Sequence, residues 1–159
     1  MIQLNVVNEY SRLEAVVLGT AHSNGPTPKV KDCYDPSSLQ HVKAGTYPIE
    51  TQMVQEINAL EAVFKAYDVA VFRPKTILQC NQIFARDVAF VIEDKLIKSN
   101  ILPQREAEFS AVYNILNHIE TEKIIELPKA CHVEGGDVIL YNDYIFIGFY
   151  NGVDYPDYI

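Results

Sequence analysis

An acidic dipeptide separates two apolar runs in the segment Val88-Ala89-Phe90-Val91-Ile92-Glu93-Asp94-Lys95-Leu96-Ile97-Lys98. This pattern of two short apolar runs around a polar pair is typical of two strands joined by a tight turn. A similar segment follows later, where Asn142-Asp143 separates Val138-Ile139-Leu140-Tyr141 from Tyr144-Ile145-Phe146-Ile147-Gly148. The sequence therefore predicts two β hairpins that resemble each other.

Helices and further strands are expected around these hairpins. Apolar residues recur at steps of three and four over residues 53–67 and 109–119, which predicts two helices that each bury one face and pack outside the strands. Pro103 suits the first turn of the second helix. Residues 20–47 hold glycines, prolines and serines without periodicity, so we expect a long loop there, as a lid, a binding loop or a surface insertion. Short β-rich runs predict the remaining strands at 13–19, 69–72 and 124–127.

The predicted elements repeat along the chain. Asp87-Val88 and Asp137-Val138 open the two hairpins, and Val71-Phe72-Arg73-Pro74-Lys75 resembles Glu126-Leu127-Pro128-Lys129. The repeating unit reads strand, strand, helix, strand, and such modules bury their faces against one another. The last hairpin would leave apolar surface uncovered. We expect a single partial α/β domain over residues 1–159, with modules at roughly 8–80 and 81–133 and the start of a third at 134–159.

Composition excludes several classes of protein. A chain of 159 residues suits one domain, and its net charge of −8 without a basic stripe argues against nucleic acid as a partner. No apolar run is long enough to cross a membrane, and the N-terminal residues do not resemble a signal peptide. Three cysteines without a Cys-x-x-Cys pair indicate reduced thiols, so we expect a cytoplasmic protein.

Acidic residues precede both hairpins. Asp87 ends the segment Asn81-Gln82-Ile83-Phe84-Ala85-Arg86-Asp87, and Glu134 begins Glu134-Gly135-Gly136-Asp137. Two carboxylates that face one cavity suit a planar guanidinium, so we expect those of Asp87 and Glu134 to lie within roughly 10 Å of each other. The two glycines would allow a close approach of the backbone. The alternative is that these acids only cap turns.

These two motifs together resemble the paired signature of the arginine deiminase, dimethylarginine dimethylaminohydrolase and amidinotransferase superfamily. The opening segment from Asn8 to Gly19 is similar to the first strand of that superfamily, and Ile101 to Glu108 resembles the segment after its second hairpin, with an Arg-x-x-Glu pattern. The resemblance implies the pentein fold, an α/β propeller of five ββαβ modules, of which about two and a half are present here.

The resemblance also implies a chemistry and a set of site residues. A cysteine thiolate would attack the guanidinium carbon of arginine or a related small molecule, and water or an amine would resolve the amidino intermediate, without a metal or cofactor. Asp87 would bind the guanidinium, and Glu134 would orient a catalytic histidine. Asn81 matches a position that contacts the polar end of the substrate. Arg105 would meet a substrate carboxylate, or else brace its loop through a salt bridge at the start of a helix.

Two features depart from the superfamily pattern. The expected His-x-Asp motif and the nucleophilic cysteine both lie beyond this sequence, so we expect the chain itself to be inactive. His132 is expected to be a structural histidine, and Cys80 and Cys131 small packing residues. A non-catalytic pentein of the ribosome anti-association factor type and an unrelated α/β domain are the competing hypotheses, and a homo-oligomeric assembly is left open.

Overall fold

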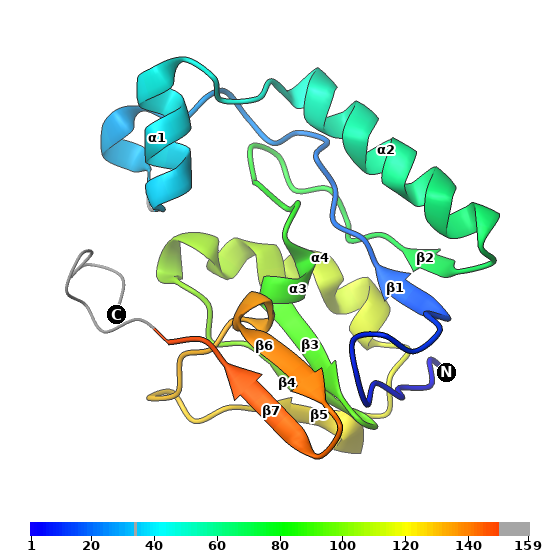
Figure 1. The fold of residues 1–159 in the computed structure, drawn as a ribbon. Coiled ribbons are helices and arrows are strands. Elements are labelled where there is room, and N and C mark those ends of the chain that lie inside the picture. Colours follow the sequence, from blue (N-terminus) through cyan, green and yellow to red (C-terminus); the bar gives the residue numbers. More distant parts are fainter. Residues whose placement is uncertain (34, 150–159) are drawn as a thin grey trace.

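The first predicted hairpin forms the centre of the fold (Figure 1). In the computed structural model, which describes residues 1–33 and 35–149, β3 (Ala89–Ile92) pairs antiparallel with β4 (Lys95–Lys98). Glu93 begins the turn with a φ of 52°, in the left-handed region that tight hairpin turns use. On its other edge β4 pairs parallel with β5 (Ile124–Glu126), which completes a three-stranded sheet in the order β3-β4-β5.

One helix covers this sheet. A single 3₁₀ turn, η2 (Pro103–Arg105), leads into α4 (Glu106–Leu116), and a second, η3 (Thr121–Lys123), leads into β5. The buried residues of α4 lie on one face of the helix, which confirms the prediction from its periodicity. This face packs on the strands in one apolar cluster that contains Val88, Leu96, Phe109, Val112, Leu116 and Ile119.

Two smaller sheets flank the central one (Figure 1). β1 (Ala15–Val17) runs parallel to β2 (Ala70–Phe72), and α2 (Glu50–Ala66) connects them. β6 (Val138–Tyr141) and β7 (Tyr144–Ile147) form the second predicted hairpin, which packs on the first where Phe90 meets Val138 and Leu140. The strands and hairpins are thus present where the sequence predicts them, although several are shorter than predicted.

The prediction of a long loop at residues 20–47 is wrong in part. The segment contains a 3₁₀ turn, η1 (Val30–Asp32), and a helix, α1 (Pro36–Ala44). Asp35 caps this helix by accepting a hydrogen bond from the Ser38 amide at 2.7 Å, and Gly45 ends it in the left-handed conformation. The aspartate, proline and glycine that suggest a loop are therefore the start and stop signals of a short helix.

The described residues form three separate sheets. Within the described residues the three sheets remain separate and do not close into a ring. The division into three modules stays a prediction, and residues 150–159 of the predicted third module lie outside the described part. No helix among the described residues is both long and apolar enough to cross a membrane.

The packing of α4 predicts that two leucine-to-alanine substitutions lower the free energy of unfolding by different amounts. Leu116→Ala removes a side chain that is 7% exposed in the central cluster and should cost about 2–5 kcal/mol of unfolding free energy. Leu78→Ala, at a position 82% exposed, should change it by no more than about 0.5 kcal/mol. Urea denaturation of both variants measures the difference, and equal costs would contradict the assignment of the core.

Candidate functional site

Three short elements bring the predicted acids together. The helix α3 (Ala85–Val88) carries Asp87, whose amide donates to the carbonyl of Phe84. Glu134 immediately precedes the 3₁₀ turn η4 (Gly135–Asp137), which contacts α3. Arg105 ends η2, just before α4 begins. The two hairpins thus start side by side, each with an acid at its entrance.

Arg105 joins the two acids. Its Nη1 atom lies 3.0 Å from Asp87 Oδ2 and 3.0 Å from Glu134 Oε2. These two carboxylate oxygens are therefore separated by less than twice that distance, well inside the separation predicted from the sequence. The guanidinium is 6% exposed, so it depends on these partners for its hydrogen bonds. Of the two roles considered for Arg105, this geometry is that of the bracing salt bridge.

A third acid, Glu108, completes the partners of Arg105. Its Oε1 accepts from Nε at 2.7 Å and its Oε2 from Nη2 at 2.9 Å, which makes a two-point ion pair within the first turn of α4. Glu108 is 5% exposed, and the sequence analysis did not select it as a site residue. The Arg-x-x-Glu spacing was the available signal, because residues three apart on a helix are neighbours.

The electrostatics of this cluster are unbalanced, because one guanidinium faces three carboxylates. Burial raises the pKa of Glu134, and the nearby Asp87 and Asp137 raise it further against the opposing effect of Arg105. Burial likewise raises the pKa of Glu108. Burial lowers the pKa of Arg105, but the three carboxylates of Glu108, Glu134 and Asp87 together raise it further, so the guanidinium stays charged. The cluster therefore carries an excess of negative charge.

A second arginine fixes the two motifs to each other. Arg86 Nε donates to the carbonyl of Gly135 at 2.7 Å, and Nη2 donates to the carbonyl of Val138 at the same distance. The same guanidinium pairs with Glu9 at 2.8 Å, and this pairing lowers the pKa of Glu9. Arg86 thus holds the Glu-Gly-Gly-Asp turn against α3, and neither Arg86 nor Glu9 was predicted as a site residue.

The two glycines are required by this contact. A Cβ atom on Gly135 would overlap the carbonyl oxygen of Arg86 and would lie 2.8 Å from the Cβ of Phe90. A Cβ on Gly136 would lie 2.6 Å from Asp87 Oδ1. The close approach predicted from the sequence is therefore an approach to the Arg86-Asp87 segment itself.

The remaining predicted residues have local roles in the described structure. Asn81 Oδ1 accepts a hydrogen bond from the amide of Ile83 at 3.1 Å, which closes a turn ahead of α3. His132 is exposed, and its Nδ1 lies 3.2 Å from the carbonyl oxygen of Asn100. Cys80 is partly buried, and burial raises the pKa of its thiol. Cys131 is exposed, so its prediction as a packing residue is wrong.

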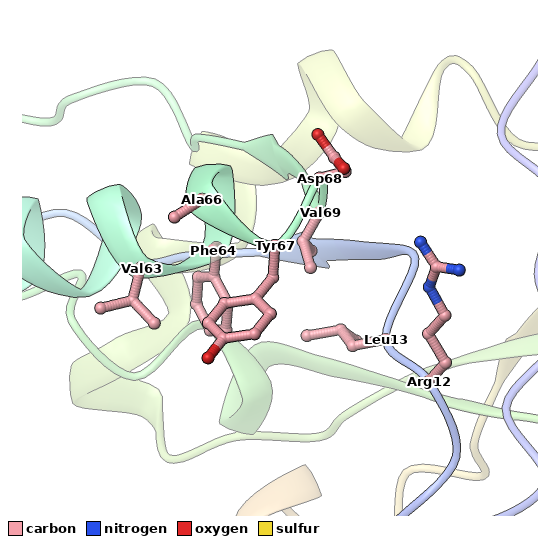
Figure 2. A pocket seen from close by; sticks show the side chains of 8 residues that line it. All are labelled: Arg12, Leu13, Val63, Phe64, Ala66, Tyr67, Asp68 and Val69. Carbon is pink, nitrogen blue, oxygen red and sulfur yellow. The ribbon is translucent and has the colours of Figure 1, made fainter.

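A wider hollow lies elsewhere in the described structure. A space of about 640 Å³ opens between the end of α2 and the start of β1, where Arg12, Leu13 and Tyr67 are among its walls (Figure 2). A second hollow of about 10 Å³ adjoins Glu108. Neither is lined by Asp87 or Glu134, so a shared cavity for those acids stays a prediction. Residues 1–33 and 35–149 contain no cluster of three side chains suited to hold a metal ion.

Solved structures of enzymes that modify guanidino groups share this fold. An inosamine-phosphate amidinotransferase from Streptomyces griseus matches with a TM-score of 0.64 at 17% identity, over 87% of this chain and 53% of that one. SxtG, an amidinotransferase from Microseira wollei in the saxitoxin biosynthetic pathway, matches with a TM-score of 0.65 at 16% identity, over 89% and 53%. A dimethylarginine dimethylaminohydrolase matches with a TM-score of 0.61 at 15% identity, over 87% and 50%.

These comparisons establish the fold of the chain. This fold is shared with part of the amidinotransferase structures and of the dimethylarginine dimethylaminohydrolase structure, in agreement with the fold that the motifs predict. The chain spans about half the length of these structures. No protein-family model and no curated protein sequence matches it.

The glycine contacts predict that Gly135→Ala is strongly destabilising. The new methyl group would meet the backbone of Arg86, which cannot move without disturbing α3, so the cost should be about 1–3 kcal/mol. Gly148→Ala is the matched control, because its Cβ would meet its nearest neighbour at an ordinary 3.6 Å. Thermal unfolding of both variants provides the measurement, and a neutral Gly135→Ala would show that the two motifs do not interlock.

The raised pKa of Glu134 predicts a pH-dependent effect of Glu134→Gln. Because the pKa of Glu134 is raised in the folded chain, the folded state holds this proton more tightly than the unfolded state does. The folded state is therefore favoured below the ordinary pKa of 4.5, and this stabilisation is lost as the pH rises. At pH 7 the neutral glutamine should therefore stabilise the chain, by about 1 kcal/mol or less because Glu134 is partly solvated. The gain should disappear as the pH falls below 4.5.

Denaturation curves of Glu134→Gln from pH 4 to pH 8 test this linkage. Glu122→Gln is the control, since Glu122 is exposed and stands apart from the cluster. A gain that does not change with pH would show that ionisation of Glu134 is not its cause.

Proposed function

We propose that this chain forms the guanidinium-binding part of an enzyme that modifies the guanidino group of arginine or a related compound. The enzyme is an amidinotransferase or an arginine deiminase-like hydrolase. One observation carries the proposal: Asp87 and Glu134 share a single guanidinium nitrogen of Arg105. The entrances of the two hairpins are thus shaped and charged for a planar cation.

Asp87 is the residue proposed to hold the substrate. Only its Oδ2 bonds to Arg105, and the side chain is 19% exposed, so Oδ1 is left to accept from a second guanidinium. The excess negative charge around Asp87, Glu108 and Glu134 favours a cationic ligand over a neutral one. Asn81 is proposed to contact the polar end of that ligand, and Arg105 keeps the carboxylates in place.

The proposed reaction proceeds through a covalent intermediate. A thiolate forms a bond to the guanidinium carbon, and the C–N bond to the leaving amine breaks as a histidine gives that amine a proton. Water or an acceptor amine then attacks the amidino carbon and releases the thiolate. Glu134 is proposed to orient the histidine and to offset its charge, as the carboxylate does in a triad.

The thiol and the histidine are proposed to come from polypeptide outside this chain, which spans about half the length of its structural neighbours. Cys80 is a poor candidate, because burial raises its pKa and the thiolate is the reactive form. We therefore propose that the chain by itself binds a guanidinium without turning it over.

Binding of arginine and of citrulline tests the guanidinium site. Citrulline has nearly the same shape but replaces the cationic guanidinium with a neutral urea group. Isothermal titration of the chain should give at least about tenfold tighter binding of arginine, a difference of about 1.4 kcal/mol. Asp87→Asn should abolish this preference, because it removes a charge that faces the cation.

Two controls define the result. Asp143→Asn changes a carboxylate in the exposed turn of the second hairpin and should keep the preference. Citrulline and ornithine assays on the same samples should detect no product. Equal binding of the two ligands would exclude the guanidinium site and favour a non-catalytic binding protein, and product formation would assign the nucleophile to Cys131 or another thiol of this chain.

A further inference from the structure

The N-terminal segment of the chain contacts both hairpins. Ile2 and Leu4 pack against the apolar cluster under α4, and Val6 packs against the cluster in which the two hairpins meet. Val6 also exchanges backbone hydrogen bonds with Glu93 in the turn of the first hairpin, at 3.0 and 2.7 Å. The segment is therefore fixed in place before it reaches Glu9.

A local turn sets the position of Glu9. Asn8 Oδ1 accepts hydrogen bonds from the amides of Tyr10 at 3.0 Å and of Ser11 at 2.7 Å. An asparagine side chain that bonds to the backbone two residues on closes a turn in this way. The Tyr10 hydroxyl donates to Asn142 Oδ1 at 3.2 Å, in the turn of the second hairpin. Glu9 thus lies on a short stretch of backbone that is bonded to this hairpin.

Both carboxylate oxygens of Glu9 bind Arg86. Oε2 accepts from Nη1 at 3.1 Å and Oε1 from Nη2 at 2.8 Å, and Oε1 also accepts from the Leu140 amide at 3.3 Å. A two-point pair of this kind holds the planar guanidinium in one orientation. The Arg86 side chain is 50% exposed, so burial alone does not fix its orientation. Glu9 supplies that constraint.

Arg86 joins the backbone segments that carry the two acids of the site. It directly precedes Asp87 in the chain, and its guanidinium donates to the carbonyl of Gly135, the residue after Glu134. Arg105, by contrast, bonds to the carboxylates at the ends of these side chains. The η4 turn therefore keeps its place beside α3 through Arg86, and the separation of the two carboxylates depends on that place.

We propose that Glu9 is a positioning residue of the guanidinium site, which fixes Arg86 and through it the separation of Asp87 and Glu134. Its effect on ligand binding rests on the function proposed above, whereas its effect on the η4 turn does not. The Glu9–Arg86 pair is partly exposed, so its contribution to the stability of the chain should be small. Loss of the pair should therefore change the site more than the free energy of unfolding.

Glu9→Asp separates position from charge. The shorter side chain keeps the negative charge but cannot reach Arg86 and the Leu140 amide together. Isothermal titration should therefore show arginine binding weakened about fivefold or more, a size typical of coupling between groups in one hydrogen-bond network. Glu126→Asp is the matched control, because it shortens in the same way the acid of an ion pair between β5 and Lys98 of β4. It should leave arginine binding unchanged.

A double-mutant cycle identifies the route of the effect. In an Arg86→Lys background, Glu9→Asp should have no further effect on arginine binding, because a lysine cannot make the two-point contact that Glu9 uses. Circular dichroism confirms that each variant is folded.

Hydrogen exchange reports on the η4 turn without a ligand. The Asp137 amide donates to the Glu134 carbonyl at 3.0 Å. Its exchange should be about fivefold or more faster in Glu9→Asp than in the wild-type chain, because the turn opens locally more often. The Leu18 amide, which bonds to a carbonyl of β2, should change less.

Three results would overturn the proposal. Unchanged arginine binding together with unchanged exchange at Asp137 in Glu9→Asp would show that the site does not depend on Glu9. An equal loss of binding in the Arg86→Lys background would exclude Arg86 as the route. An equal loss in Glu126→Asp would show an effect common to surface ion pairs.

A failure of the proposed function gives a different result. The wild-type chain would then bind arginine no better than citrulline, while exchange of the Asp137 amide would still respond to Glu9→Asp. That outcome would remove the guanidinium ligand and keep the role of Glu9 in positioning the η4 turn.

Discussion

The buried guanidinium of Arg105 connects the elements that carry the candidate site. Arg105 is almost inaccessible to solvent and satisfies itself with carboxylates from α3, α4 and the turn before β6. Removing the cation of such a buried ion cluster typically costs about 3–5 kcal/mol, because the carboxylates that remain are left unpaired. The relative position of the two hairpins therefore depends on Arg105 as much as on the contact between Phe90, Val138 and Leu140.

The two arginines of the site bind different kinds of group. Arg86 donates to two backbone carbonyls as well as to Glu9 and holds the Glu-Gly-Gly-Asp turn, whereas the hydrogen bonds of the Arg105 guanidinium go to carboxylates. Because three acids meet one buried cation, the cluster stays negative, and burial raises the pKa of Glu108 and Glu134. An excess of negative charge of this kind is the electrostatic basis of the cation binding that we propose.

The sequence predicted those features that depend on local pattern. The two apolar runs around Glu93-Asp94 predicted the first hairpin, and the apolar stripe from Phe109 to Ile119 predicted α4. Asp87 and Glu134 were found because each belongs to an acidic motif that directly precedes one of the two hairpins. Glu108 was overlooked because an acid at the start of a helix usually faces water, and α1 was overlooked because Asp35 and Gly45 serve turns and helix caps equally well.

What the sequence could not predict is burial that depends on a neighbour. The hairpins β3–β4 and β6–β7 both consist of two apolar runs around a polar pair. In both, the first residue of the turn, Glu93 or Asn142, has a left-handed φ. Leu96 is nevertheless buried under α4, while Ile145 on the corresponding strand is 50% exposed. The alternation specifies a strand with one apolar face, but what covers that face is set by the element that packs on it. The same reasoning applies to β1, whose sequence resembles an interior strand although, among residues 1–33 and 35–149, only β2 pairs with it. An apolar strand such as β1 therefore needs a further element to cover it. The repeat indicates which kind of element this is, because the corresponding strand β4 of the central sheet is paired on both edges.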